Sequence, residues 1–108
     1  MNVVVAGLGV SGAAAARALA ARGERVTVLE SADGERQRAT AAGLAELGVE
    51  VRFGEPALPA GTSLLVTSPG WRPTHPLLVA AADAGVEVIG EVELAWRLRQ
   101  EPAAPGWR

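Results

Sequence analysis

The chain has 108 residues, of which 49% are hydrophobic and 20% are charged, and its formal net charge is −2. This length suits one domain, and this composition is typical of a globular protein and not of a disordered or membrane-spanning chain. The charge excludes a general basic field for nucleic acid or membrane surfaces. The sequence contains no cysteine, no lysine and one histidine, which excludes disulfides, thiol catalysis, a P-loop lysine and a histidine metal site.

Short apolar runs alternate with segments that have helical spacing or helix caps. In chain order we predict strand 2–6, helix 10–21, strand 25–30, helix 34–47, strand 49–53, strand 63–67, helix 76–84, strand 86–89 and helix 91–99. No basic residue precedes the first apolar run, so we expect a strand there and not a secretory signal, and a cytoplasmic protein. The alternation predicts an α/β fold with an open, mostly parallel five-stranded sheet and helices on both faces.

Two helices are assigned their buried faces from apolar spacing alone. The predicted faces are Ala39, Ala42, Leu44 and Leu47 in the second helix, and Val92, Leu94, Ala95 and Leu98 in the last. Residues 1–100 are expected to form the domain. The proline- and glycine-containing tail at 101–108 is expected to be a linker.

The stretch GLGVSG at 7–12 follows a predicted strand and precedes a predicted helix, which is the setting of a nucleotide-binding glycine motif. In such a motif Gly7 permits a tight turn, Gly9 lets the backbone approach a pyrophosphate, and Gly12 lets the helix pack closely. Backbone N–H groups near Val10 and Ser11 would then face an anion at the start of the helix. A glycine turn that binds no ligand is the alternative.

Glu30 ends the second predicted strand, 18 residues beyond Gly12. In a parallel sheet this places a carboxylate at the carboxyl edge, near the ribose or base of a nucleotide, although a solvated strand end would look the same. Together with the glycine motif it predicts a nucleotide site. It leaves the nucleotide open, because a carboxylate accepts equally well from a ribose hydroxyl and from a base N–H.

A second loop, TSPGWRPTHP at 67–76, follows the fourth strand and should reach the same edge. Trp71, Arg72 and His75 could offer a stacking surface, a phosphate partner and a polar cap. The alternatives are a tryptophan covering an apolar edge, a solvated arginine and a histidine at a helix start. His75 is not expected to act as a general base, because no nucleophile or acidic partner accompanies it.

With these motifs in place, the chain resembles a known family. GLGVSG, an acidic residue ending the second strand, and VTSPGWRPTHPLLVAAADAGVEVIGEVELAW at 66–96 are similar to the N-terminal domain of the MurD enzymes of the Mur ligase family. The resemblance covers about residues 2–99 and implies a Rossmann-like domain that holds the UDP part of the substrate, UDP-N-acetylmuramoyl-L-alanine. The full enzymes also have a central ATPase domain and a C-terminal domain. They add D-glutamate through an acyl phosphate in peptidoglycan synthesis, and so support cell-wall formation, cell shape and division.

The resemblance also implies roles for individual residues. Val10 and Ser11 would bind the diphosphate through backbone N–H groups and the Ser11 hydroxyl. Glu30 would accept from uracil N3–H, Ser31 would offer its backbone N–H to a uracil carbonyl, and Gly70 would lie against the uridine. Gly7, Gly9 and Gly12 belong to the same site through the glycine motif.

The sequence departs from the family pattern at three points. Ala32 stands where some members have an arginine, and Glu30 stands where aspartate is frequent. The ATP-binding GTNGKT-type loop is absent from the sequence, so we expect an excised N-terminal domain that needs no cofactor and does not ligate alone. ATP and Mg²⁺ would belong to the full-length enzyme, whose central and C-terminal domains would be the partners.

Two other functions remain compatible with the residues. GLGVSG and Glu30 alone would suit an NAD-binding module of an oxidoreductase or a regulatory domain. A structural docking domain with a vestigial site is the third possibility, and it predicts no nucleotide affinity.

Overall fold

The computed structural model describes residues 1–54, 57–67 and 74–100. Its elements are β1 (Asn2–Ala6), α1 (Val10–Ala21), β2 (Arg25–Glu30), α2 (Glu35–Ala45), β3 (Glu50–Phe53), β4 (Leu64–Thr67), α3 (Pro76–Ala84), β5 (Glu87–Gly90) and α4 (Glu91–Gln100). All nine predicted elements are present. The predicted domain at 1–100 contains them all, while the predicted linker at 101–108 lies outside the described residues.

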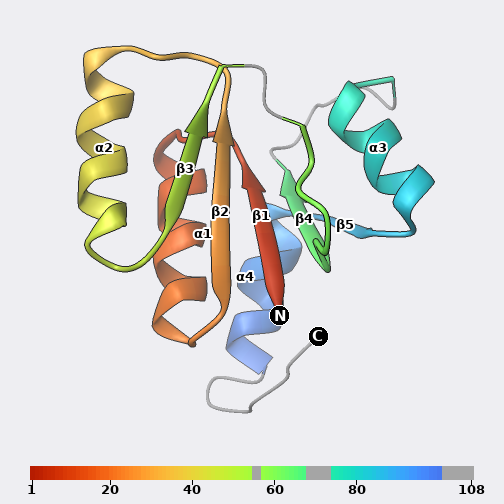
Figure 1. Ribbon diagram of the computed structural model, residues 1–108. Coiled ribbons are helices and arrows are strands. Elements are labelled where there is room, and N and C mark those ends of the chain that lie inside the picture. The colour runs from red at the N-terminus through yellow and green to blue at the C-terminus, as the bar shows by residue number, and fades with distance from the viewer. Residues whose placement is uncertain (55–56, 68–73, 101–108) are drawn as a thin grey trace.

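The five strands form one sheet in the order β3-β2-β1-β4-β5, and every neighbouring pair is parallel (Figure 1). The predicted α/β fold, with an open parallel sheet, is therefore confirmed. The chain winds outward from β1 in one direction to β3, and then returns to the other side of β1 to form β4 and β5. The strand order thus reverses between β1 and β4. In open sheets of this kind, ligands bind beyond the carboxyl ends of the strands at such a point.

Both faces of the central strand β1 are covered, which explains why residues 3–6 are all apolar. Val3 and Val5 face a large cluster that includes side chains of α1, α2 and α4, such as Leu19, Leu44 and Leu94. Alternate residues of the strand face a smaller cluster formed with α3 and with Leu58. Figure 1 shows the same layering, with α3 apart from the other three helices.

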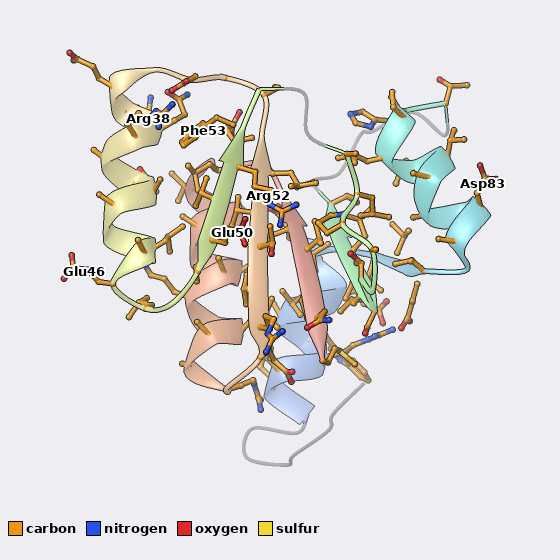
Figure 2. All side chains as sticks on the ribbon, in the orientation of Figure 1. Arg38, Glu46, Glu50, Arg52, Phe53 and Asp83 are labelled. Atoms are coloured by element: carbon orange, nitrogen blue, oxygen red, sulfur yellow. The ribbon has the colours of Figure 1, made fainter. Side chains whose placement is uncertain are left out.

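Among the described residues, the cluster on the face that carries α3 includes side chains of β1, β2 and β4 but none of β3. On β3, charged side chains take the positions on this face: Glu50 pairs in register with Thr27, and Arg52 with the buried Leu29. Glu50 and Arg52 are exposed and form an ion pair of 2.6 Å (Figure 2). At the opposite edge of the sheet, Glu87 of β5 pairs with Arg97 of α4 at 2.7 Å.

The buried face predicted for α2 is largely wrong. Leu44 is buried, but Ala39 and Ala42 are exposed and Leu47 retains 52% of its accessible surface. The helix ends at Ala45, two residues before the predicted end, so Leu47 lies in the closing turn before Gly48, whose φ is +84°. Small alanines on several sides of a helix give little information about which side faces the core.

The predicted face of α4 is half wrong for the same reason. Leu94 is 1% exposed and Leu98 packs on the core, whereas Val92 is 78% exposed and Ala95 is also exposed. Two leucines four residues apart set the buried side of this short helix.

Among the helices of residues 1–54, 57–67 and 74–100, none combines the length and the apolar character needed to span a membrane.

Candidate functional site

The three glycines of the loop between β1 and α1 have different structural roles. Gly7 has a φ of +101°, which favours glycine, and its N–H donates to the carbonyl oxygen of Leu29 at 2.8 Å. At Gly12, a Cβ would lie 2.2 Å from the carbonyl oxygen of Gly7, so any side chain there would collide with the turn. Gly7 and Gly12 are therefore required by the fold itself.

Gly9 is different, because the ligand-free fold gives no reason for a glycine there. Its φ of −73° suits any residue, and a Cβ at this position would meet nothing within 4 Å. Gly9 is the N-cap of α1, and its carbonyl oxygen accepts the N–H of Ala13 at 2.9 Å. The bare backbone at this position leaves open space at the start of the helix, as expected where a ligand approaches the main chain.

The start of α1 is suited to receive an anion. The first N–H groups of a helix have no acceptor within the helix, and the helix dipole makes this end positive. Gly9 provides no side-chain cap, the first turn contains no acidic residue, and Val10 is 83% exposed, with Ser11 exposed beside it. Nothing in the side chains of this turn competes with a negatively charged group.

Both carboxylate oxygens of Glu30 accept a hydrogen bond from a backbone N–H. Oε1 accepts the N–H of Leu8 at 2.7 Å, and Oε2 accepts the N–H of Ala32 at 2.9 Å. Its main-chain carbonyl also accepts the N–H of Gly54 at 3.1 Å. The sequence placed this carboxylate at the correct edge, but it gave no sign of these bonds, because the donors are backbone groups that any residue type supplies.

Two clefts meet at Glu30. One, of about 580 Å³, lies beyond the carboxyl ends of the strands and is bordered by Gly7, Leu29, Ser31, Gly54, Leu58, His75, Leu77 and Ala80 among others. The second, of about 400 Å³, lies between α1 and α2 and is bordered by Gly9, Val10, Arg17, Arg36 and Thr40 among others. The predicted residues Gly7, Gly9, Val10, Glu30 and Ser31 all line one cleft or the other, and Ser11 and Gly12 adjoin them in the chain.

The first cleft is largely apolar and the second carries two guanidinium groups. This contrast suits a ligand with a flat, weakly polar ring at one end and negative charge at the other. Gly70, Trp71 and Arg72 lie outside the described residues.

His75 stands at the start of α3 and caps it, as the alternative of a histidine at a helix start predicted. Its Nδ1 accepts the N–H of Leu77 at 3.1 Å, and Pro76 occupies the first helical position. His75 also borders the larger cleft, so it contributes a polar edge to an otherwise apolar wall.

Asp33 and Arg38 form a further charged pair on the turn after β2 and on α2. Arg38 donates from Nε and Nη2 to the two carboxylate oxygens of Asp33, at 2.5 and 2.6 Å, and its guanidinium lies 4.3 Å from the ring centre of Phe53 (Figure 2). These hydrogen bonds lower the pKa of the Asp33 carboxyl below its ordinary value. Among the described residues, no three acidic, histidine or cysteine side chains gather where they could hold a metal ion.

Comparison with known proteins decides the family. Residues 1–90 match the family model described as "Mur ligase MurD-like, N-terminal domain". The chain belongs to this family. The match does not favour an NAD-binding module of another family.

Curated relatives of this MurD-like domain carry one name. The chain is 63% identical over 107 residues to the UDP-N-acetylmuramoylalanine–D-glutamate ligase of Thermobifida fusca (strain YX), covering 98% of this chain and 23% of that protein. It is 60% identical over 105 residues to the ligase of the same name from Streptomyces avermitilis, covering 96% of this chain and 22% of the relative. The MurD-like domain therefore spans between a fifth and a quarter of the length of these relatives.

A solved structure supports the fold. The murein peptide ligase of Psychrobacter arcticus 273-4 superposes on 94% of this chain with a TM-score of 0.74 and 18% identity, and the match covers 20% of that protein. At this identity the likeness is one of architecture.

Proposed function

We propose that this MurD-like domain binds the UDP part of UDP-N-acetylmuramoyl-L-alanine, within a ligase that adds D-glutamate to that compound. The names of the curated relatives support the substrate and the amino acid. ATP and Mg²⁺ would act in the central domain of the full-length enzyme, which would work in peptidoglycan synthesis. The domain by itself would bind and would not ligate.

The observation that carries the proposal is the bare backbone at Gly9. An ordinary φ and empty surroundings mean that the ligand-free fold would accept a side chain there. A diphosphate lying across the start of α1 would explain the glycine at position 9, because the phosphates would need an accessible backbone there. The N–H groups of Val10 and Ser11, together with the Ser11 hydroxyl, would then donate to the phosphate oxygens.

The uracil would occupy the larger cleft. Leu29, Leu58 and Leu77 border this cleft and would face the ring, while Ser31 would offer its backbone N–H to a uracil carbonyl. Each oxygen of the Glu30 carboxylate holds one backbone donor, and each retains a second lone pair. Glu30 can therefore accept uracil N3–H and keep its hydrogen bonds to Leu8 and Ala32. Gly70, which lies outside the described residues, is proposed to border the uridine.

Calorimetric titration tests this function directly. The purified chain should bind UDP-N-acetylmuramoyl-L-alanine and UDP, and should not bind NAD. Gly9→Val should weaken binding of both UDP compounds at least tenfold while the chain stays folded, because the φ at this position suits any residue and a Cβ there meets nothing within 4 Å. Glu30→Ala should weaken UDP binding by about 1–3 kcal/mol.

Three results would contradict the proposal. Binding of NAD in place of the UDP compounds would favour a dinucleotide module. An undiminished affinity in Gly9→Val would remove the diphosphate from the start of α1. If neither ligand binds, the domain does not bind the substrate by itself, either because the site is vestigial or because it requires the other domains of the ligase.

A further inference from the structure

Glu30 joins two loops that are distant in the chain. Leu8 belongs to the glycine loop between β1 and α1, and Ala32 belongs to the turn between β2 and α2. One carboxylate accepts a backbone N–H from each, at 2.7 and 2.9 Å. The Leu8 side chain is only 6% exposed, so this part of the loop is fixed from two sides.

Two consecutive residues at the end of β2 accept hydrogen bonds from two consecutive residues of the glycine loop. The carbonyl oxygen of Leu29 accepts the N–H of Gly7, and the carboxylate of Glu30 accepts the N–H of Leu8. The next residue, Gly9, is the N-cap of α1 and has no side chain to hold it. The direction in which the chain enters the helix is therefore set by the two bonds that precede Gly9.

A carboxylate beside a diphosphate site also needs an explanation, because two negative charges repel each other. Ion pairing does not provide it: within the described part of the chain, Arg17 and Arg36 border the same cleft as Glu30 but form no salt bridge with it. The bonds to Leu8 and Ala32 do provide a reason for an acidic residue at this position.

We propose that Glu30 is a positioning residue whose carboxylate holds the glycine loop in the conformation that presents the N–H groups of Val10 and Ser11 to the diphosphate. This inference rests on the proposed function and adds a role that operates before any ligand arrives. Contact with uracil and support of the loop are separate tasks of the same side chain, and different measurements separate them.

Glu30→Gln tests the two tasks with little change in shape. Leu8 and Ala32 donate to different oxygens of Glu30, and a glutamine in the same position has an NH₂ group in place of one of them, so one of the two N–H groups would lose its acceptor. Glu35→Gln is the matched control, because it makes the same chemical change at an exposed position in the first turn of α2. Glu35 makes no contact with the glycine loop among the bonds described above.

The first readout is amide hydrogen exchange of the ligand-free chain by NMR. In Glu30→Gln, the amide of Leu8 or of Ala32 should exchange roughly tenfold faster than in wild type, and in Glu30→Ala both should do so. A role limited to uracil contact would leave both amides unchanged without ligand.

The second readout is the affinity for inorganic pyrophosphate, which has no uracil. Removing a negative charge near an anion should strengthen binding if electrostatics alone operate. Loss of the loop support should instead weaken it, and we expect Glu30→Gln to lower pyrophosphate affinity several-fold while Glu35→Gln leaves it unchanged or slightly raised. The two explanations thus predict opposite signs.

Unchanged exchange at Leu8 and Ala32, or tighter pyrophosphate binding by Glu30→Gln, would overturn the positioning role. So would a wild-type chain that binds UDP but not pyrophosphate, because the loop would then not recognise the diphosphate by itself. If wild type binds no UDP compound, the proposed function fails, and the exchange data still decide whether Glu30 holds the loop.

Discussion

Gly12 in α1 and Gly43 in α2 are both helical glycines, and we predict opposite effects when each is replaced by alanine. A Cβ at Gly12 would lie 2.2 Å from the carbonyl oxygen of Gly7, about 1.2 Å short of the 3.4 Å at which ordinary contact begins. Because the opposing atom belongs to the backbone, α1 or the preceding turn would have to move. A Cβ at Gly43 would meet nothing within 4 Å.

The expected magnitudes differ in sign. Alanine in place of glycine favours a helix by roughly 1 kcal/mol, so Gly43→Ala should stabilise the chain by about 0.5–1 kcal/mol. At Gly12 the same gain is offset by overpacking, which costs about 1–3 kcal/mol or more, and displacement of the loop adds to it. We therefore expect a net destabilisation of about 1–2 kcal/mol for Gly12→Ala.

Urea denaturation followed by circular dichroism measures both values, since linear extrapolation gives the free energy of unfolding in water. UDP titration of the same variants should show weaker binding for Gly12→Ala alone. A Gly12→Ala chain as stable as Gly43→Ala would refute the reasoning, because it would show that α1 does not press on the turn.

Three further predictions concern the core, a surface pair and the second cleft. Leu94→Ala should lower the free energy of unfolding by about 2–5 kcal/mol in urea denaturation, because the side chain is 1% exposed, whereas Val92→Ala in the same helix should change it by less than about 0.5 kcal/mol. Arg38→Ala should return the lowered pKa of Asp33 toward its ordinary value in a carboxyl NMR titration. Since that pKa is lowered by folding, the small stabilisation from the pair is present above the unfolded-state pKa and is lost as the pH falls through the folded-state pKa. Arg17→Ala should weaken UDP binding modestly and reduce its dependence on salt, because Arg17 borders the cleft at the start of α1.

The sequence predicted the architecture well because the strongest signals belong to the central strands. The run at 3–6 is apolar throughout, and such a run is typical of a strand covered on both faces. The glycine caps at Gly23 and Gly85 also fixed two helix ends, and Gly85 has the left-handed φ of +71° expected of a cap. The parallel sheet follows from this alternation of strands and helices.

The helix faces and the inner bonds of the site could not be predicted in the same way. Alanine is small and occurs on all sides of α1 and α2, so its spacing does not show which side is buried. The bonds of Glu30 depend on backbone donors at Leu8 and Ala32. Ala32 is only two residues away in the chain, but Leu8 is 22 residues away and comes within reach only after β1 and β2 have paired. The sequence identified the right carboxylate, but tertiary structure gives it two protein partners.

The outer strands of the sheet bear on how the domain behaves at high concentration. An exposed strand edge offers free N–H and C=O groups to a strand of another molecule, which is a common route to aggregation. Here β3 and β5 form the two edges, and each carries a carboxylate paired with an arginine, Glu50 with Arg52 and Glu87 with Arg97. The exposed Glu50–Arg52 pair adds little stability. Charged side chains on edge strands instead disfavour the addition of a foreign strand.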